Sequence, residues 1–408
     1  MNSLLEAQQV APAKEPARTT AAAARPSRVD GRKLAVGFLC AEYPSLQPGH
    51  GGIGSVVQTL ARALVARGHS ATVYALRDHE GVSWDEGVKV VAVPRRSAWS
   101  AIVTMRRRLR RDFEAGLIQV VDTPECEAHC APAGVPSIVR MQGSHHFWCA
   151  TLDQSRRYSR LLLEQWGIRQ AHALCAVSTY AAEVTRRAMH LGRRRIEILS
   201  NPVDTALFTP RPESVVPNRI VFAGGITEKK GVRELSLAMP AVLARFPDAE
   251  LILIGRDIPV PGTPLLRETI LQTLDERSRR RVRFLGPLPR PEVSAYMASA
   301  HVCVFPSHME TQGIVIAEGL ACGRPVITTS AGPGPEMLGA DGECGWLVDP
   351  RSPDDIASKI VRVLGEADHG ERLGRNGRRR ADEQFSLTSS MDRNLEFWAR
   401  VIARRTAV

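Results

Sequence analysis

The chain has 408 residues, of which 44% are hydrophobic and 24% charged, and its formal net charge at pH 7 is +11. This composition is typical of globular proteins, and the length predicts two or three domains. No run approaches 18 uninterrupted apolar residues, so we expect no transmembrane helix. The first residues also lack the apolar core of a signal peptide.

Residues 1–32 are rich in Ala, Pro, Arg and Thr and contain little apolar surface to bury. Such a composition does not offset the entropy lost on ordering, so we expect a disordered tail. The tail carries only a small part of the net charge, so the excess of basic residues belongs mainly to the folded part.

Eight cysteines are scattered along the chain, mostly in apolar surroundings that suit small buried side chains. Unpaired cysteines of this kind favour a reducing compartment, and we expect a cytoplasmic protein. Cys126 and Cys130 flank a Glu-Ala-His segment, but no second ligand pair with suitable spacing follows. We therefore expect no bound metal and no cofactor.

The first half of the chain alternates between strand and helix patterns. An amphipathic pattern over 54–69 ends at a Gly-His pair and predicts a helix. Short runs rich in Val, Ile and Ala predict strands of one parallel sheet. These runs are 33–41, 70–76, 88–94, 116–123, 136–142, 173–178 and 196–202.

A proline-rich break at 208–218 separates this unit from a second one with the same alternation. Strands are predicted at 219–225, 249–255, 282–288, 302–307, 324–330 and 345–350, and helices at 232–247, 353–383 and 389–404. The fold class is therefore α/β, with two Rossmann-like domains facing each other across a cleft and a linker near 205–217. The expected domains are residues 33–205 and 206–387.

The segment 305–325 holds two carboxylates, Glu310 and Glu318, between one predicted strand and the next. Glu310 lies in a loop, and the backbone N–H groups of Gln312, Gly313 and Ile314 open a helix. Helix N-termini attract anions, and Glu318 follows about 8 Å further along the helix axis. A nucleotide-diphosphate sugar, which has a charged centre and hydroxyl groups at both ends, fits this spacing.

A glycine-rich loop at 49–54 matches the letters of the dinucleotide fingerprint, so an NAD-dependent dehydrogenase is an alternative. Seven residues separate this loop from the preceding strand, and the expected acidic partner has no clean match. The better interpretation is a flexible loop whose backbone, including Gly52 and Gly54, approaches a phosphate or sugar. A structural glycine turn also remains open.

Arginines cluster at 106–111 and at 193–195. The first cluster lies on a predicted helix whose other face is apolar, and a solvated face is the simplest interpretation. The alternative is attraction to an anionic membrane or acceptor, which would place the protein peripherally at the inner face of a membrane. Zinc-finger spacing and aromatic platforms are missing from the sequence, so we expect no nucleic-acid partner.

Taken together, these segments resemble the retaining glycosyltransferases of family 4, which have the two-domain GT-B fold. The resemblance extends from about Lys33 to the final helix, and its most specific part is Glu310 followed eight positions later by Glu318. Supporting segments are 51–54, 201–204, 222–225, 230–231 and 345–348. The resemblance implies an N-terminal acceptor domain, a C-terminal donor domain, and a final segment, 388–408, that returns to the first domain.

The resemblance also implies roles for individual residues. Glu318 would bind ribose hydroxyls, Glu310 would hold the donor sugar, and the N–H groups from Gln312 through Gly313 to Ile314 would bind sugar and phosphate. Lys230 would neutralise the departing diphosphate without a metal ion. Further donor-binding residues would be Gly52, Gly54, Gly225, Lys229, Arg256 and Leu288.

Two positions depart from the family pattern. Gly225 stands where an arginine often lies, which removes one cationic contact with the donor, and Lys229 is the candidate replacement. Gln142 stands where the first domain often has a histidine; it can donate a hydrogen bond but cannot titrate. The neighbouring His145 and His146 are candidates for that role, with packing as the alternative.

The sequence therefore predicts a retaining hexosyltransferase with Glu310, Lys230, Gln142 and His145 as catalytic residues. The donor would be a UDP- or GDP-sugar, and the acceptor a growing glycan, a lipid-linked molecule or a small metabolite. The acceptor would dock on the first domain, near residues 51–54, 124–125 and 143–146. The rival interpretation is a catalytically weakened nucleotide-sugar-binding protein, which Gly225 and Gln142 keep open.

Overall fold

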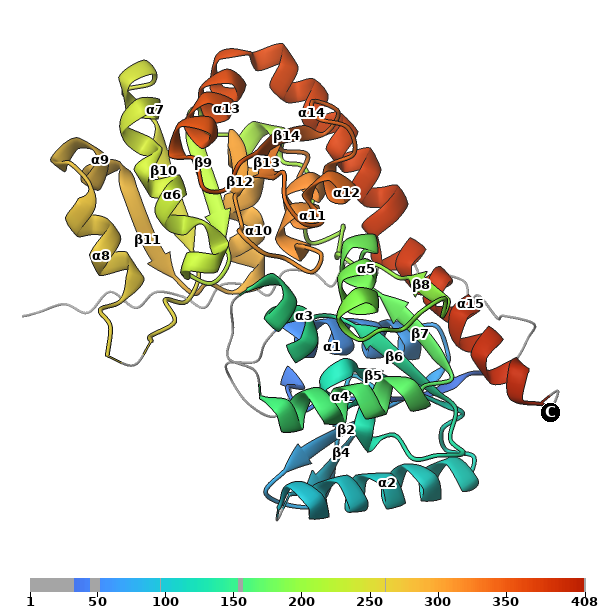
Figure 1. Ribbon diagram of the computed structural model, residues 1–408. Helices are drawn as coiled ribbons and strands as arrows, with labels where there is room; N and C mark the ends of the chain where they lie inside the picture. The colour runs from blue at the N-terminus through green and yellow to red at the C-terminus, as the bar shows by residue number, and fades with distance from the viewer. Residues whose placement is uncertain (1–32, 45–51, 96, 153–156, 261, 407–408) are drawn as a thin grey trace, which may run out of the picture.

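The computed structural model describes residues 33–44, 52–95, 97–152, 157–260 and 262–406. These residues form two α/β domains, each built on its own sheet, and one long C-terminal helix that runs from one domain to the other (Figure 1). The predicted tail at 1–32 and the first part of the glycine loop lie outside the described residues. Within the described ranges, the helices lack the combination of length and apolar character that crossing a bilayer requires.

The first domain contains an eight-stranded sheet in the order β3-β4-β2-β1-β5-β6-β7-β8. All neighbouring pairs are parallel except β3 with β4. The strands are β1 Ala35–Leu39, β2 Ser70–Arg77, β3 Gly81–Asp85, β4 Val88–Pro94, β5 Val120–Pro124, β6 Ser137–Met141, β7 Ala173–Ala176 and β8 Ile196–Ile198.

Strand β3 corrects the expectation of a purely parallel sheet. It pairs antiparallel with β4 through a two-residue turn, Glu86-Gly87, in which both residues have positive φ angles of 49° and 84°. Two-residue hairpin turns favour this backbone because its twist matches that of the strands. The segment was missed because β3 lies at the sheet edge, and its exposed Val82 and Trp84 give no buried pattern.

Helices cover the first sheet on both faces. In α1, the apolar residues Val56, Val57, Leu60 and Leu64 recur at helical spacing and are buried against the sheet. The helices are α1 Gly52–Ala66, α2 Ala98–Glu114, α3 His145–Thr151, α4 Tyr158–Gln170 and α5 Thr179–Ala188, with a 3-10 helix, η3, at Glu125–Cys130.

The second domain contains a six-stranded parallel sheet in the order β11-β10-β9-β12-β13-β14. Its strands are β9 Arg219–Ala223, β10 Glu250–Ile254, β11 Val282–Gly286, β12 Val302–Phe305, β13 Val326–Thr329 and β14 Gly345–Val348. Its helical segments are η4 Pro212–Ser214, η5 Glu228–Lys230, α6 Val232–Leu237, α7 Met239–Arg245, α8 Leu266–Thr273, α9 Glu276–Arg281, α10 Arg290–Ala298, α11 Ile314–Ala321, α12 Gly334–Leu338, α13 Pro353–Gly365, α14 Ala367–Arg380 and η6 Ala381–Phe385.

Two helices that were expected to be continuous are each divided. The helix predicted at 232–247 breaks between α6 and α7 at Ala238, because Pro240 lacks an N–H group and suits the first turn of a new helix. The segment 353–383 divides at Glu366 into α13 and α14, and a π-helical turn, η6, follows. The sequence pattern gave the helical character but not these breaks.

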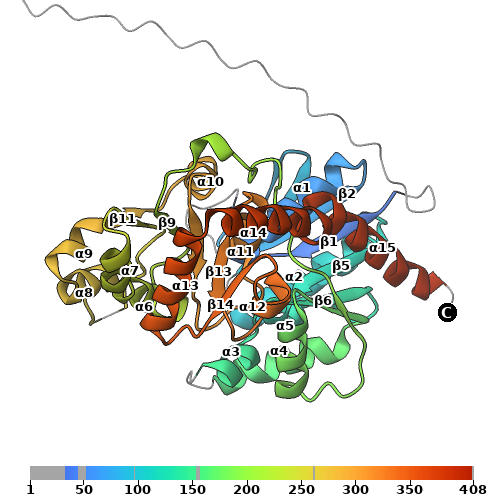
Figure 2. The same cartoon turned by 90° about the horizontal axis from the view of Figure 1, so that it is seen from above.

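The chain passes between the domains twice, at neighbouring points. Val203 and Ser386 form an isolated parallel bridge in which the Val203 N–H donates to Phe385 O at 2.7 Å and the Leu387 N–H donates to Val203 O at 3.0 Å. Beyond this bridge, α15 (Leu387–Thr406) runs back along the first domain, as the red helix in Figures 1 and 2 shows. The C-terminal helix therefore belongs structurally to the first domain.

A buried polar network attaches α15 to the first sheet. The Arg140 guanidinium donates to both oxygens of Asp122, at 2.7 and 3.2 Å, and to Asn394 Oδ1 at 2.7 Å. Trp398 Nε1 donates to Asp122 Oδ2 at 2.9 Å. Charged groups buried in this way are tolerated because the two charges are paired and are hydrogen bonded to neighbouring side chains.

We expect the Asp122→Ala variant to unfold more easily, because it leaves the Arg140 guanidinium buried without its countercharge. Loss of one partner of a buried pair lowers the free energy of unfolding by about 3–5 kcal/mol. Urea denaturation of the full chain measures the difference. The control is Glu183→Ala, which removes the exposed Glu183–Arg186 pair and should cost at most about 1 kcal/mol. Equal effects of the two variants would contradict this assignment.

Candidate donor-sugar site

Two loops meet at the carboxyl ends of the adjacent strands β9 and β12. Lys230, at the end of η5, donates a hydrogen bond to Glu310 in the loop after β12. Ser307 Oγ donates to the same Glu310 oxygen at 3.1 Å. The backbone N–H of His308 donates to Lys229 O at 2.9 Å, which joins the two loops independently of their side chains. The structure therefore brings the predicted Lys230 and Glu310 together.

Gly231 makes this close approach possible. It has a φ angle of +66°, and a Cβ atom at this position would lie 1.9 Å from Pro306 O. A larger residue would be strained by the backbone angle and would also push the second loop away. The glycine after Lys230 is therefore required by the contact that positions the lysine.

Helix α11 begins beside Glu310. Gly313 precedes the helix with a φ angle of +85°, and a Cβ atom there would lie 2.6 Å from Ile316 Cδ1 and 3.8 Å from Glu310 Cγ. The first N–H groups of a helix have no acceptor within the helix, so the backbone from Ile314 onward offers donors next to Glu310. Gln312 itself lies before the helix rather than in its first turn.

Glu318 lies on α11 and is only 4% exposed. Arg290 Nη2, from the start of α10, donates to Glu318 Oε1 at 2.9 Å. Burial raises the pKa of Glu318, and the nearby Arg290 charge opposes that rise. The Arg290 guanidinium also lies over the Phe208 ring, 5.1 Å from its centroid. A half-exposed arginine thus stands beside the carboxylate expected to bind ribose.

Sequence reasoning missed Arg290, although it follows closely on Leu288, which was expected to line the base pocket. The Arg-Pro-Glu sequence at the start of α10 was the available signal, since proline favours a first helical turn. Leu288 itself is partly buried and packs against the core of the second domain.

The side chain of Gln312 contacts the first domain rather than open space. It is 1% exposed, accepts a hydrogen bond from the Asn201 N–H at 2.7 Å and donates to Asn201 O at 3.2 Å. The oxygen and the nitrogen of the Gln312 side-chain amide are therefore both hydrogen bonded to the backbone of Asn201, close to where the chain passes between the domains. Only the backbone of Gln312 remains for the predicted contact with a donor.

Three further contacts hold the second domain against α5 of the first domain. Ser178 Oγ donates to Thr311 O at 2.5 Å. Glu336, from α12, accepts hydrogen bonds from the Thr179 N–H at 2.9 Å and from Thr179 Oγ1 at 3.1 Å. A carboxylate at a helix N-terminus is stabilised by the free N–H groups and by the helix dipole. Met309 completes the contact by packing in a cluster with residues of α3 and α5.

Gly225 stands where family members often have an arginine, and Lys229, the candidate replacement, points toward the first domain. Lys229 Nζ lies over the ring of Trp148 in the first domain, 5.1 Å from its centroid, and burial lowers the pKa of Lys229. A Cβ atom on Gly225 would meet Ile258 Cδ1 at 3.5 Å and Thr227 Cγ2 at 3.9 Å, which are ordinary contact distances, so glycine is not required there by packing. Arg256 is exposed, and its carbonyl accepts a hydrogen bond from the Ile226 N–H at 2.8 Å.

Gln142 is buried at the first domain's side of the interface. Its N–H and that of Gly143 both donate to the carboxylate of Glu125, at 2.9 and 3.3 Å. Gly143 has a φ angle of +119°, and a Cβ atom there would lie 3.1 Å from Thr311 Cγ2. The turn that carries Gln142 therefore abuts the loop that carries Glu310.

The contacts of His145 argue against its predicted catalytic role. His145 Nε2 accepts a hydrogen bond from the Arg157 N–H at 3.0 Å and lies 3.7 Å from Cys149 Sγ. His146 Nε2 lies 3.0 Å from Leu161 O. Both rings are engaged inside the first domain, where they tie α3 to the chain around α4, and the alternative of a packing role describes them better.

Gly52 and Gly54 begin helix α1, and the rest of the glycine loop lies outside the described residues. A Cβ atom on Gly54 would lie 2.0 Å from Glu42 O, so this glycine permits α1 to pack against the end of β1. Among the described residues, no atom lies within 4 Å of a Cβ atom built on Gly52. The described geometry thus supports a structural role for Gly54.

Within the described ranges, His, Cys, Asp and Glu side chains form no group of three or more that could hold a metal ion. Cys126 and Cys130 lie in η3, and all eight cysteines are free. Two carboxylates of η3, those of Glu125 and Glu127, have strongly shifted pKa values. Burial raises the pKa of both Glu125 and Glu127 to about 7.

We expect the Glu125→Gln variant to flatten the pH dependence of stability. Burial raises the pKa of Glu125 from its usual 4.5 to about 7 in the folded state, so the folded state favours the protonated form. Its contribution to stability is therefore full below about pH 4.5 and is lost as the pH rises through about 7. Melting temperatures from pH 5 to 8 should fall more for the natural chain than for the variant. Parallel curves would contradict the assignment.

Comparison with known proteins places these observations in a family. The profile described as Glycosyltransferase Family 4 matches residues 50–207, and the profile described as Glycosyl transferases group 1 matches residues 217–366. Together they cover about three quarters of the chain. The matches identify glycosyltransferases, so the dehydrogenase alternative is set aside.

Several curated relatives carry transferase or synthase names. The MMP alpha-(1->4)-mannosyltransferase of Mycolicibacterium hassiacum is 33% identical over 62% of this chain and 60% of the relative. The alpha-maltose-1-phosphate synthase of Mycolicibacterium smegmatis is 30% identical over 59% of this chain and 66% of the relative. The chain therefore spans less than two thirds of each of these two relatives.

Solved structures share the fold. Sucrose-phosphate synthase from Thermosynechococcus elongatus superposes with a TM-score of 0.76 at 20% identity, over 91% of this chain and 100% of the other. HepE from Anabaena, in complex with UDP, superposes with a TM-score of 0.69 at 15% identity, over 90% of this chain and 100% of the other. With its two family matches and two Rossmann-like domains, this chain belongs to the family 4, group 1 glycosyltransferases and has their GT-B fold.

Proposed function

We propose that this protein transfers a hexose from a UDP- or GDP-sugar to a hydroxyl group of its acceptor, with retention of the anomeric configuration. The observation that carries the proposal is the contact between Lys230 and Glu310 at the start of α11. A cation, a carboxylate and helix N–H groups are needed together where a sugar leaves its diphosphate. The names of its relatives, which include mannosyltransferases and inositol 3-phosphate glycosyltransferases, support sugar transfer.

The diphosphate end of the donor would lie against Lys230 and the first turn of α11. Preorganised positive charge stabilises the leaving group most when the glycosidic bond is breaking, which is the form of electrostatic help that raises turnover. The pair with Glu310 keeps Lys230 in place before the donor arrives. In this proposal Lys230 and the backbone supply the neutralising charge, and the reaction uses no metal ion or other cofactor.

The nucleoside end would lie near Glu318 and Arg290. A ribose presents two neighbouring hydroxyl groups, and a carboxylate can accept hydrogen bonds from both. Arg290 holds the Glu318 carboxylate at 2.9 Å and is itself half exposed, so it can contact a base or a phosphate. Glu318 and Glu310 thereby fix the two ends of the donor.

Glu310 would accept hydrogen bonds from hydroxyl groups of the transferred sugar. Its contacts with Lys230 and Ser307 are those of a positioned acceptor, and we assign it no nucleophilic role. Retention is what the resemblance to the retaining family 4 enzymes implies, and one relative is named as a GDP-mannose-dependent alpha-(1-6)-phosphatidylinositol monomannoside mannosyltransferase. The sugar would be attacked on the face from which the diphosphate leaves.

The acceptor would dock on the first domain, beside Gln142 and Gly143. Relatives are named for acceptors that include phosphatidylinositol monomannoside and inositol 3-phosphate, which supports a polyol or glycan acceptor, lipid-linked or soluble. Gln142 lies in the turn that abuts the Glu310 loop, where it can donate to a sugar hydroxyl. Contact between the domains would exclude water that would otherwise hydrolyse the donor.

A panel of nucleotide sugars tests the proposal directly. The correct donor should raise the melting temperature, because a ligand that binds only the folded state stabilises it. Incubation with that donor should then give transfer to sugar or inositol acceptors, or slow release of free sugar. Binding without either reaction would favour the nucleotide-sugar-binding alternative, and absence of any binding would overturn the proposal.

We expect Lys230→Ala to lower kcat by about 10²–10³-fold, which is the usual effect of removing one group that stabilises developing charge. Steady-state kinetics with the identified donor measure the change. Lys89→Ala, a lysine on β4 far from the site, serves as the matched control and should leave kcat unchanged. Unchanged turnover in Lys230→Ala would remove the lysine from the proposed mechanism.

We expect Glu318→Gln to weaken nucleotide binding about 10- to 100-fold, because it removes the charge from a carboxylate that accepts hydrogen bonds. Calorimetric titration with UDP and GDP measures the affinity. Glu292→Gln changes an exposed carboxylate on α10, close to Arg290, and should change affinity less than twofold. If the two variants bind equally well, Glu318 does not contact the nucleoside.

A further inference from the structure

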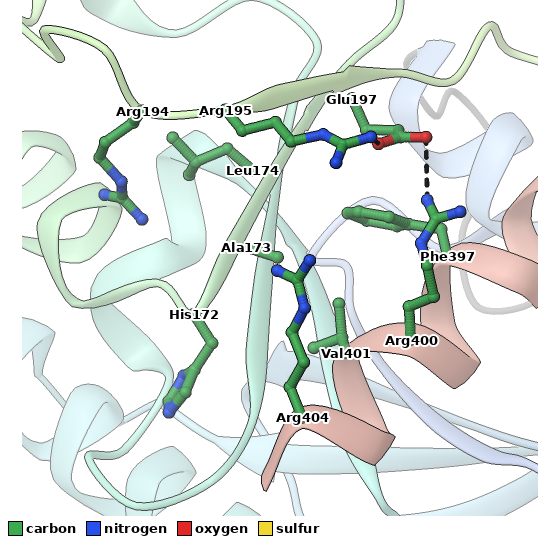
Figure 3. Close-up of a pocket in the computed structure, with 10 residues that line it drawn as sticks. All are labelled: His172, Ala173, Leu174, Arg194, Arg195, Glu197, Phe397, Arg400, Val401 and Arg404. Atoms are coloured by element: carbon green, nitrogen blue, oxygen red, sulfur yellow. Dashed lines mark hydrogen bonds and ion pairs between the residues drawn. The ribbon is translucent and has the colours of Figure 1, made fainter.

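A pocket lined by arginines lies between α15 and the edge of the first sheet (Figure 3). Its walls come from three segments that are far apart in the sequence: the start of β7, the turn and strand around β8, and the last turns of α15. The lining residues are His172, Ala173, Leu174, Arg194, Arg195, Glu197, Phe397, Arg400, Val401 and Arg404.

This pocket is separate from the proposed donor site. It lies at the amino end of β7, beside Ala173, whereas the carboxyl end of the same strand leads to Ser178, which contacts Thr311 of the second domain. The two ends of a parallel strand lie at opposite edges of the sheet. A ligand in this pocket would therefore not touch the residues assigned to sugar transfer.

The positive charge of the pocket exceeds its negative charge. Arg195 and Arg400 share one carboxylate, that of Glu197, at 3.2 and 2.9 Å. Glu197 is the sole acidic residue in the lining, against four arginines. The pairing leaves a net positive surface, which in a concave site attracts anions.

One of the arginines is held rigidly by the backbone. Arg194 donates to Ile168 O at 2.7 Å and to Ala171 O at 2.6 Å, carbonyl groups at the end of α4. These bonds keep its charge at the wall of the pocket. Arg404, on the last turns of α15, is exposed and has no ion pair with any described residue, so it is available to a ligand.

The base of the pocket is apolar. Leu174, Phe397 and Val401 are all buried, and the volume enclosed is about 160 Å³. Figure 3 shows the arginine side chains of α15 and of the turn before β8 around these residues. A cationic rim over an apolar base suits a small organic phosphate. Its phosphate group would bind the arginines, and its carbon atoms would contact the apolar surface.

We propose that this pocket binds a phosphate monoester, carried either by a soluble metabolite or by a lipid headgroup. The phosphate contacts Arg400 and Arg404 from α15 and Arg195 from the first domain. Because these residues belong to both sides of the pocket, the bound phosphate adds a bridge between α15 and β8. Binding here is independent of the proposed transfer reaction.

Calorimetric titration of the full chain with glycerol 3-phosphate at low ionic strength tests the proposal. The titration is repeated in a Lys230→Ala background, so that binding at the donor site does not contribute. Saturable binding with similar affinity in both proteins is expected, and it should weaken as salt is added. Loss of binding in the Lys230→Ala background would overturn the proposal. Absence of saturable binding would also overturn it if the vesicle experiment below shows no flotation that depends on Arg404.

Paired arginine variants locate the site. Arg404→Gln should weaken glycerol 3-phosphate binding at least tenfold, while Arg193→Gln should change it less than twofold, because Arg193 is exposed and neighbours the pocket in sequence without lining it. Glu197→Gln should strengthen binding severalfold by releasing Arg195 and Arg400. Melting temperatures verify that each variant folds. Equal weakening by Arg404→Gln and Arg193→Gln would show only diffuse surface charge and would overturn the site.

Vesicle flotation distinguishes the two sources of the phosphate. Vesicles of phosphatidylcholine with phosphatidic acid, which presents a phosphate monoester, are compared with phosphatidylcholine alone. Flotation that depends on phosphatidic acid and is lost in Arg404→Gln supports a lipid headgroup. Glycerol 3-phosphate binding without flotation supports a soluble phosphate. Flotation that Arg404→Gln leaves unchanged, together with no binding of glycerol 3-phosphate, contradicts the proposal.

Discussion

The buried ion pair between Asp122 and Arg140 is the interaction on which the two-domain arrangement depends. It lies inside the first sheet, yet two of its hydrogen bonds go to α15, through Asn394 and Trp398. A buried charge is stable only when it is paired and hydrogen bonded. The helix α15 must therefore pack against the first sheet, because Asn394 and Trp398 supply hydrogen bonds to this ion pair. The second passage of the chain at Ser386 follows from that requirement.

With the crossing fixed, the interdomain contacts determine where the loops that carry Lys230 and Glu310 lie. Gln312 is hydrogen bonded to the backbone of Asn201, and Glu336 caps helix α5 from the opposite domain. Both residues belong to loops or helices that follow strands of the second sheet, as Glu310 does. The carboxyl ends of the second sheet are thereby held against the first domain, and a rotation between the domains would have to break these bonds.

Much of this organisation could be predicted because it is local. Alternating apolar patterns predicted the parallel strands, and the order of Lys230, Glu310 and Glu318 predicted which loops meet, since carboxyl ends of parallel strands share one edge. Arg290 could not be found in this way, because its contact with Glu318 joins segments 28 residues apart through packing. His145 shows the opposite situation: its residue type suggested catalysis, whereas its ring accepts a hydrogen bond from the Arg157 N–H within its own domain.

The sequence by itself determined the class of fold, the family and the carboxylate pair Glu310 and Glu318, because these depend on periodicity and on short motifs. Tertiary structure alone decided two other features: the use of Gln312 as an interdomain contact, and the assembly of a cationic pocket from the turn before β8 and from α15. In each case the partners are distant in sequence, and only the packed chain brings their hydrogen-bonding and charged groups within reach of one another.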